Sequence, residues 1–188
     1  MAKFSESIDR TWTLFLDRDG VINEKLDGDY VKQISEFKFI NGSKEAIRKM
    51  NEIFGITVVV TNQQGIGKEL MTEDDLKVIH HYMLSELALE GAKIDKVYHC
   101  PDLAEKNSIC RKPNTGMAEE ARKDFPAIDF KSSIMVGDSI SDMQMGKRVG
   151  MITVYIHPDE ELPKEADYVC KSLFELAEVL AQSLESGI

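Results

Sequence analysis

The chain has 188 residues, of which 43% are hydrophobic and 30% charged, a profile typical of a folded protein rather than a disordered one. Its formal net charge of −10 argues against sequence-independent binding to nucleic acid, which needs a basic surface. No apolar run reaches the roughly 18–20 residues that a membrane-spanning helix requires, so we expect no membrane association.

The N-terminus and the cysteines indicate the compartment. Residues Met1–Glu6 lack the apolar stretch of a signal peptide. The three cysteines, Cys100, Cys110 and Cys170, are too few and too odd in number for a disulfide framework. We therefore expect a protein of the reducing cytoplasm, and we expect it to be a monomer.

Strand and helix patterns alternate along the chain. In chain order they predict a strand at Thr11–Leu16, a helix at Ser43–Ile53, a strand at Ile56–Val60, a helix at Thr72–Leu89, a strand at Val97–Cys100, a helix at Gly116–Asp124, a strand at Ser133–Val136, a helix at Ser141–Val149, strands at Met151–Ile156 and Tyr168–Cys170, and a helix at Ser172–Leu184. This alternation predicts an α/β protein with one parallel sheet and helices on both of its faces. The length suits a single domain over residues 1–188.

Polar residues follow the predicted strands. Asp17 and Asp19 come directly after the first strand, Thr61 after the second, and Asp138 after the fourth, while Lys112 lies in a long loop after the third. Ligands of such sheets bind outside the carboxyl ends of the strands. We therefore expect these side chains to converge at one edge of the sheet.

The predicted chemistry at this edge is attack by a carboxylate on phosphorus. Asp17 is the candidate nucleophile, and a cation must offset the repulsion between two anions. Mg²⁺ prefers hard oxygen ligands, and the side chains of Asp17 and Asp138 with the carbonyl of Asp19 would supply them. The Asp19 side chain would act as general acid on the leaving oxygen and then as general base on water.

Three neighbouring groups would bind the phosphoryl oxygens. We expect Lys112 to neutralise charge on Asp17, while the Thr61 hydroxyl and backbone amides near Asn62 donate hydrogen bonds. Each motif alone also has an ordinary structural explanation: Asp142, for example, is as readily an acid in the first turn of a helix as a functional group. The combination of motifs in this order favours a catalytic site.

The motifs resemble those of the haloacid dehalogenase superfamily of phosphatases, and within it the histidinol-phosphate / D-glycero-D-manno-heptose 1,7-bisphosphate phosphatase group. The segments that carry the resemblance are Leu16–Asn23, Thr61–Ile66, Arg111–Pro113 with Gly116-Met117, and Val136–Asp138. The resemblance implies a Rossmann-like fold with little or no cap domain, Mg²⁺ dependence and an aspartyl-phosphate intermediate. It also implies substrate contacts from Asn62, Gln63, Gln64 and Arg111, and from Tyr30 in the flap after the first strand.

The sequence departs from the family at a zinc-binding loop. The family's loop often reads Cys-x-His and then Cys-x-Cys-Arg-Lys-Pro, whereas this chain keeps Cys100 and Cys110 but has Asp102 and Ser108 at the other two positions. Structural zinc sites are built from Cys and His. His99 and Cys100 are neighbours on a predicted strand, so their side chains point in opposite directions. We predict that no zinc is bound and that backbone turns and packing hold this loop.

A second departure concerns the substrate. Ser139 stands where heptose-bisphosphate phosphatases often have a lysine. We expect a small sugar phosphate as substrate, first of all D-glycero-D-manno-heptose 1,7-bisphosphate. Histidinol phosphate is the alternative in the same chemical class, although the dehydratase domain that would favour it is not expected in 188 residues. A polynucleotide 3′-phosphatase shares similar motifs, but the acidic balance speaks against it, and a non-catalytic binding protein would have lost a catalytic acid.

Overall fold

The computed structural model describes residues 8–159 and 162–186, and these form one six-stranded parallel sheet with the strand order β3-β2-β1-β4-β5-β6. The strands are β1 (Thr13–Leu16), β2 (Ile56–Asn62), β3 (Lys96–Cys100), β4 (Ser133–Gly137), β5 (Ile152–Ile156) and β6 (Tyr168–Cys170). The α-helices are α2 (Ser43–Ile53), α3 (Glu73–Leu89), α4 (Gly116–Asp124), α5 (Ile140–Val149) and α6 (Leu173–Ser186), and the short 3-10 helices are η1 (Ile34–Glu36), η2 (Ala104–Lys106) and η3 (Phe130–Ser132).

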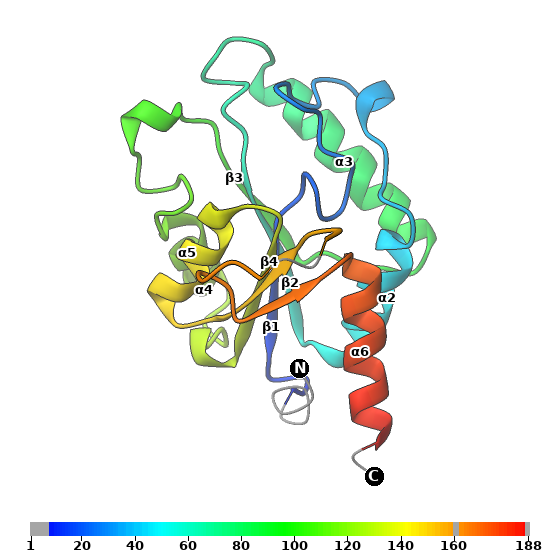
Figure 1. The fold of residues 1–188 in the computed structure, drawn as a ribbon. Coiled ribbons are helices and arrows are strands. Elements are labelled where there is room, and N and C mark those ends of the chain that lie inside the picture. Colours follow the sequence, from blue (N-terminus) through cyan, green and yellow to red (C-terminus); the bar gives the residue numbers. More distant parts are fainter. Residues whose placement is uncertain (1–7, 160–161, 187–188) are drawn as a thin grey trace.

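Helices cover both faces of the sheet (Figure 1). Helices α2, α3 and α6 bury their apolar side chains with Leu14 and Leu16 of β1 in one core cluster. Helices α4 and α5 pack on the opposite face with Phe15 of the same strand. Alternate residues of a strand point to opposite faces, so the fully buried run of β1 contributes to both clusters, as expected for a central parallel strand.

The register of the central strands aligns their carboxyl ends. Leu16, the last residue of β1, lies beside Val59 of β2 and Val136 of β4. The amide of Asp17 continues this pairing by donating to the carbonyl oxygen of Val136 at 2.9 Å. In Figure 1 this edge lies at the top of the sheet, and the beginning of β1 and the end of α6 lie at the opposite end.

The predicted fold class is confirmed, and most predicted elements agree with the structure to within one or two residues. The predicted end of the second strand at Val60 is wrong. Thr61 and Asn62 lie inside β2, because they pair with His99 and Cys100 of β3. Between the described strands no second domain is inserted, and the flap of residues 17–42 between β1 and α2 holds only η1.

The loop from β3 to α4 is closed by a disulfide between Cys100 and Cys110. This corrects the prediction that backbone turns and packing alone hold the loop. The small number of cysteines argued against a network of disulfides, but a single disulfide between two nearby cysteines is enough to close this loop. The third cysteine, Cys170, is buried at the end of β6. The N-terminal residues Met1–Glu6, to which the signal-peptide argument referred, lie outside the described residues, and no described helix is both long and apolar enough to cross a membrane.

Candidate active site

A buried lysine joins two carboxylates at the carboxyl edge of the sheet. Lys112 Nζ lies 2.7 Å from Asp17 Oδ1 and 2.6 Å from Asp142 Oδ1, and it also donates to the carbonyl oxygen of Val60 at 2.8 Å. Its side chain is 2% exposed, so it is removed from bulk solvent. A buried ammonium is tolerated only when it is paired and hydrogen-bonded, and both conditions are met here.

Three carboxylates in this edge fit a divalent cation. Oxygens of Asp17, Asp138 and Asp142 all lie within 4.8 Å of one another. Asp138 Oδ1 is buried without a hydrogen-bond partner, an arrangement that is costly unless a cation supplies the missing interaction. Hard carboxylate oxygens are the donors that Mg²⁺ prefers. Asp142 therefore lies beside the two predicted side-chain ligands, Asp17 and Asp138, and the ligand roles of these residues and of the Asp19 carbonyl stay predictions.

The crowding of charge changes the proton affinities of these groups. Burial raises the pKa of Asp17 to about 6, against the opposing charge of Lys112. Burial and the negative charge of Asp17 also raise the pKa of Asp138. Although burial works against the charge of Lys112, the neighbouring Asp142 and Asp17 hold its pKa above the ordinary value. The lysine therefore stays charged and supplies the fixed positive charge of the site.

Two glycines allow the carboxylates to come this close. A Cβ on Gly20 would lie 2.3 Å from Asp138 Oδ2, and Gly20 has a φ of +87°, which side chains rarely adopt. A Cβ on Gly137 would lie 2.3 Å from the Cβ of Asp142. The Asp-x-Asp-Gly and Gly-Asp motifs therefore need glycine for steric reasons.

The side chain of Asp19 is held by a set of donors. Arg18 Nη2 donates to both of its oxygens at 2.9 Å, Asn23 Nδ2 to Oδ1 at 2.9 Å, and Gln63 Nε2 to Oδ2 at 2.8 Å. Burial favours the neutral acid, but the charge of Arg18 and these hydrogen bonds outweigh it and hold the pKa of Asp19 below its ordinary value. The carboxylate form of Asp19 is thus favoured, and its position beside Asp17 is fixed.

Arg18 in turn is held by a histidine from α3. Its side chain is fully buried, and Nη1 lies 3.1 Å from His80 Nε2. Burial and the positive charge of Arg18 lower the pKa of His80 to about 3. The imidazole is therefore neutral, and its Nε2 accepts the hydrogen bond from Arg18.

A pocket opens over this edge of the sheet. It is lined by Asp17, Asp19, Lys25, Leu26, Asp29, Tyr30, Val31, Thr61, Asn62, Arg111, Lys112, Asp138, Ser139 and Ser141. Two predicted substrate contacts are missing from this lining. Gln63 is fully buried and donates to Thr61 Oγ1 as well as to Asp19, and Gln64 donates to the Tyr30 hydroxyl at 2.7 Å.

Comparison with known proteins agrees with this geometry. A family model described as HAD-hydrolase-like matches residues 109–176. The chain is 41% identical over 159 residues to the D-glycero-alpha-D-manno-heptose-1,7-bisphosphate 7-phosphatase of Campylobacter jejuni, covering 85% of this chain and 88% of that protein. The chain belongs to the haloacid dehalogenase superfamily of phosphatases. Within it, the chain belongs to the histidinol-phosphate / D-glycero-D-manno-heptose 1,7-bisphosphate phosphatase group.

Two further relatives align with about nine tenths of this chain. The D-glycero-beta-D-manno-heptose-1,7-bisphosphate 7-phosphatase of Pasteurella multocida is 36% identical over 178 residues, covering 89% of this chain and 95% of that protein. A crystal structure of D,D-heptose 1.7-bisphosphate phosphatase from B. bronchiseptica complexed with magnesium and phosphate has a TM-score of 0.82 and 30% identity, covering 91% of this chain and 98% of that one.

The sequence reasoning missed several groups of the phosphatase site. For Asp142 the sequence favours an acid in the first turn of a helix and a functional group equally. In the structure its Oδ2 accepts from Ser139 at the start of α5, and its Oδ1 contacts Lys112. Its position four residues after Asp138 could have indicated the shared edge. Lys25 and His80 carry no local signal, since one lies in an irregular loop and the other in a helix far along the chain.

The Asn62 side chain forms hydrogen bonds with the main chain of Lys112, which the sequence did not indicate. Its side-chain oxygen accepts from the amide of Lys112 at 3.0 Å, and its side-chain nitrogen lies 3.2 Å from the carbonyl oxygen of the same residue. This pair of bonds holds the main chain that carries the buried lysine. The predicted contacts of Asn62 and Arg111 with substrate stay predictions.

Proposed function

We propose that this protein is a Mg²⁺-dependent phosphomonoester hydrolase that forms an aspartyl-phosphate on Asp17. The observation that carries the proposal is the buried contact of Lys112 with Asp17 and Asp142, next to Asp138, at the carboxyl ends of the central strands. Repulsion between a carboxylate and a phosphate dianion opposes attack, and a fixed ammonium reduces that repulsion.

The proposed cation would be held by Asp17 and Asp138, with Asp142 beside them. The donor set supports this, because it offers carboxylate oxygens and one of them, Asp138 Oδ1, has no other partner. When bound, Mg²⁺ would neutralise phosphoryl oxygens and hold them near the nucleophile. The relative from B. bronchiseptica, whose structure contains magnesium and phosphate, supports this choice of ion.

The proposed reaction has two steps. Asp17 attacks phosphorus, the bond to the leaving oxygen breaks, and Asp19, protonated for this step, gives that oxygen its proton and becomes the carboxylate that its donors favour. Asp19 then takes a proton from water, the water oxygen attacks phosphorus, and the bond to Asp17 breaks to release inorganic phosphate. The donors around Asp19 favour its carboxylate form, so the base role in the second step suits its environment best.

The proposed substrate is a small sugar phosphate, first of all D-glycero-D-manno-heptose 1,7-bisphosphate hydrolysed at its 7-phosphate. Relatives that cover most of the chain carry that name, and the chain spans most of their length. Thr61, Asn62 and Arg111 line the pocket beside Lys112, where they would contact the phosphate and the sugar. Tyr30, which is bonded to Gln64, would contact the sugar from the flap.

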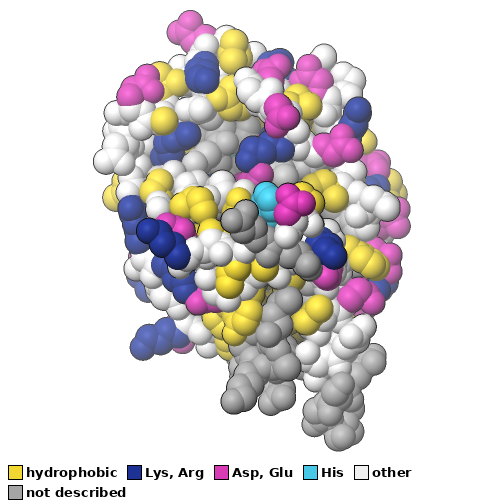
Figure 2. All heavy atoms as spheres, viewed as in Figure 1, with side chains coloured by type: hydrophobic (Ala, Val, Ile, Leu, Met, Phe, Trp, Pro, Cys, Tyr) yellow, Lys and Arg dark blue, Asp and Glu magenta, His cyan; other side chains and the backbone are white. Residues whose placement is uncertain are grey.

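We also propose a cytoplasmic monomer, a single catalytic domain and no nucleic-acid partner. On the face shown in Figure 2, Lys and Arg side chains are most frequent on the side of α4 and α5, and acidic side chains on the opposite side. Two of the cations on α4 and α5 are engaged in ion pairs, Arg122 with Glu119 and Lys147 with Asp167. Such paired cations are poorly suited to track a nucleic-acid backbone.

The experiment that tests this function compares kcat/KM for three substrates side by side. We expect the heptose bisphosphate to exceed both histidinol phosphate and a 3′-phosphorylated oligonucleotide by at least about tenfold, and chelation by EDTA to abolish all activity until Mg²⁺ is restored. A higher value for either competitor would contradict the proposed substrate. Full activity in EDTA would contradict the proposed role of the cation.

We propose in addition that the loop of residues 100–110 binds no zinc. Oxygens and sulfurs of Cys100, Asp102 and Cys110 lie within 4.8 Å of one another, and Ser108 Oγ lies 3.5 and 3.4 Å from the two sulfurs. The sulfurs are bonded to each other, and thiolates rather than disulfides ligate zinc.

Elemental analysis of untagged protein tests the absence of zinc, with free thiols counted in the same unfolded, unreduced sample. We expect no zinc and one reactive thiol per chain, that of Cys170, which lies outside the disulfide. About one zinc per chain with three free thiols would contradict both the disulfide and the proposal.

A further inference from the structure

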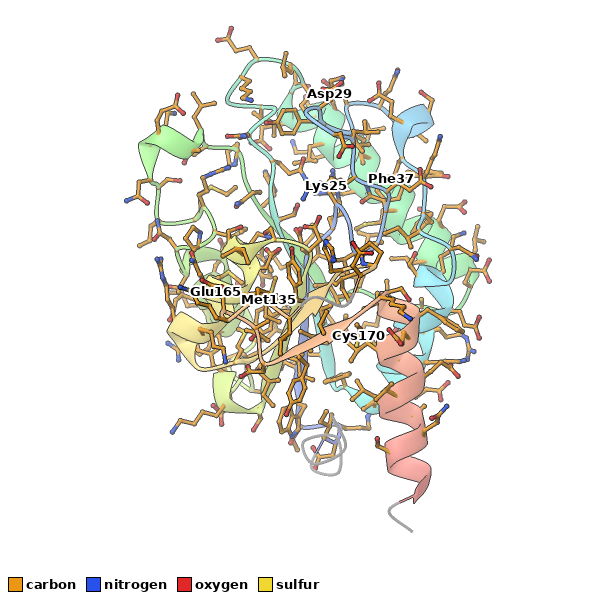
Figure 3. All side chains as sticks on the ribbon, in the orientation of Figure 1. Lys25, Asp29, Phe37, Met135, Glu165 and Cys170 are labelled. Atoms are coloured by element: carbon orange, nitrogen blue, oxygen red, sulfur yellow. A yellow bond between two sulfur atoms is a disulfide. The ribbon has the colours of Figure 1, made fainter. Side chains whose placement is uncertain are left out.

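Lys25 places a third cation in the pocket lining, beside Arg111 and Lys112, from the flap after β1. Its Nζ lies 2.6 Å from Asp138 Oδ2, and its side chain is 51% exposed. Figure 3 shows Lys25 on this loop above the carboxyl ends of the strands, with Asp29 farther along the same flap. Both residues line the pocket.

The ion pair of Lys25 with Asp138 is exposed on the lysine side only. The Lys25 side chain is 51% exposed, so water can solvate its ammonium when it leaves, whereas the Asp138 side chain is 15% exposed and would need another cation in its place. The pair also uses a carboxylate that the proposed cation needs, and a bound cation would repel the ammonium. The long, flexible lysine side chain can then turn into the pocket without a change in the backbone.

Two other cations near the pocket are buried with their partners, and a third comes from another loop. Lys112 is buried between Asp17 and Asp142, and Arg18 is fully buried against Asp19 and His80. Arg111 lines the pocket from the loop between β3 and α4, where Nη1 donates to the carbonyl oxygen of Asp102 and the other donors remain for the substrate contacts proposed above. Ser139, which follows Asp138, offers only a hydroxyl, and that hydroxyl donates to Asp142. On the flap, Lys25 is thus the cation of the pocket lining, and its half-exposed side chain can reach a ligand once it leaves Asp138.

We propose that Lys25 is a specificity-determining residue, which leaves Asp138 when the site fills and binds a phosphate of the substrate other than the one transferred to Asp17. This inference rests on the proposed function, because it requires a substrate with two phosphates. The transferred phosphate already has Lys112 and the cation as partners, whereas a second phosphate at the flap needs a partner of its own.

Binding to a variant that cannot turn over tests this role. In an Asp17→Asn background with Mg²⁺, calorimetry would measure binding of the heptose 1,7-bisphosphate and of the heptose 7-phosphate. We expect Lys25→Met to weaken binding of the bisphosphate about tenfold or more and to change binding of the monophosphate less than about twofold. Lys25→Arg keeps the charge and should retain most of the affinity for the bisphosphate.

Lys32 provides the matched control. It is a lysine of the same flap that pairs with the nearby Asp29 and does not line the pocket, so Lys32→Met should leave binding of both compounds unchanged. If Lys25→Met weakened binding of both compounds equally, Lys25 would bind the transferred phosphate. If it weakened binding of neither compound, Lys25 would bind neither phosphate. Either result overturns the inference.

Titration with Mg²⁺ alone separates this inference from the proposed function. We expect Lys25→Met to bind Mg²⁺ at least as tightly as the unsubstituted protein, because it removes a competitor for Asp138. Weaker Mg²⁺ binding would make Lys25 a support of the metal site and would overturn the inference. If the unsubstituted protein instead hydrolyses no bisphosphate and Asp17→Asn binds none, the proposed substrate fails, and the inference fails with it.

Discussion

Gly20 determines how closely the loop after β1 can approach Asp138. The glycine adopts a left-handed backbone conformation, and its α-carbon faces the carboxylate of Asp138. Gly28 in the same flap has a similar φ of +70°, but no atom lies within 4 Å of the position of its Cβ. Both positions therefore disfavour a side chain because of their positive φ, but only at Gly20 would a Cβ also clash with a neighbouring residue.

This contrast gives a prediction for the proposed Mg²⁺ site. Gly20→Ala should displace the Asp138 carboxylate, weaken Mg²⁺ binding about tenfold or more and reduce kcat, whereas Gly28→Ala should cost only the backbone strain of about 1 kcal/mol. Calorimetric titration with Mg²⁺ and thermal unfolding would measure the two effects. Equal Mg²⁺ affinity in both variants would contradict the steric role of Gly20.

At the scale of elements, α3 reaches the site through His80. This helix begins with a capping box in which Thr72 and Asp75 bond each other's backbone amides, and it buries His80 against Arg18. The helix thereby supports the arginine that holds Asp19. Since the imidazole must stay neutral in this position, α3 also makes the folded state sensitive to acid.

The pH dependence of stability follows from the lowered pKa of His80. Its pKa of about 3 in the folded protein lies below the ordinary 6.5, so its contribution to stability is complete above pH 6.5 and is lost as the pH falls toward 3. From pH 7.5 to 5, the free energy of unfolding should fall by about 2 kcal/mol more in the unsubstituted protein than in His80→Gln.

Denaturant unfolding at both pH values would measure this difference. Glutamine can still accept the hydrogen bond from Arg18, so the substitution itself should lower the free energy of unfolding only modestly. An equal loss of stability in the two proteins would contradict a neutral, buried His80. The quantity to compare between the two proteins is the change in the free energy of unfolding from pH 7.5 to 5, not its value at either pH.

The elements and the acidic residues of the site were predictable for a physical reason. Strands buried on both faces read as apolar β-branched runs, and a carboxylate such as Asp17 or Asp138 directly after one has few structural explanations. The end of β2 was missed because pairing with β3 extends the strand over polar residues. Partners such as His80 and Lys25 were not predictable, because their contacts depend on tertiary packing and not on local pattern.

At the scale of the whole molecule, a protein of net charge −10 is proposed to bind an anionic substrate. The negative net charge does not prevent this, because three cations lie where the central strands end. Lys112 lies beside Asp17, Arg18 beside Asp19 and Lys25 beside Asp138. The field inside a pocket is governed by such nearby charges, while the acidic surface affects mainly solubility and long-range encounter.

The central claim is that the phosphoryl group passes through Asp17. In Asp19→Asn, loss of the base that activates water should leave the phosphoenzyme to accumulate. The measurement is mass spectrometry of that variant after mixing with the heptose bisphosphate and Mg²⁺, with borohydride reduction to mark the acyl phosphate. We predict one added phosphoryl group per chain, located at Asp17 and absent from Asp17→Asn/Asp19→Asn. A phosphoryl group on another residue, or hydrolysis by Asp17→Asn at the unsubstituted rate, would contradict the account.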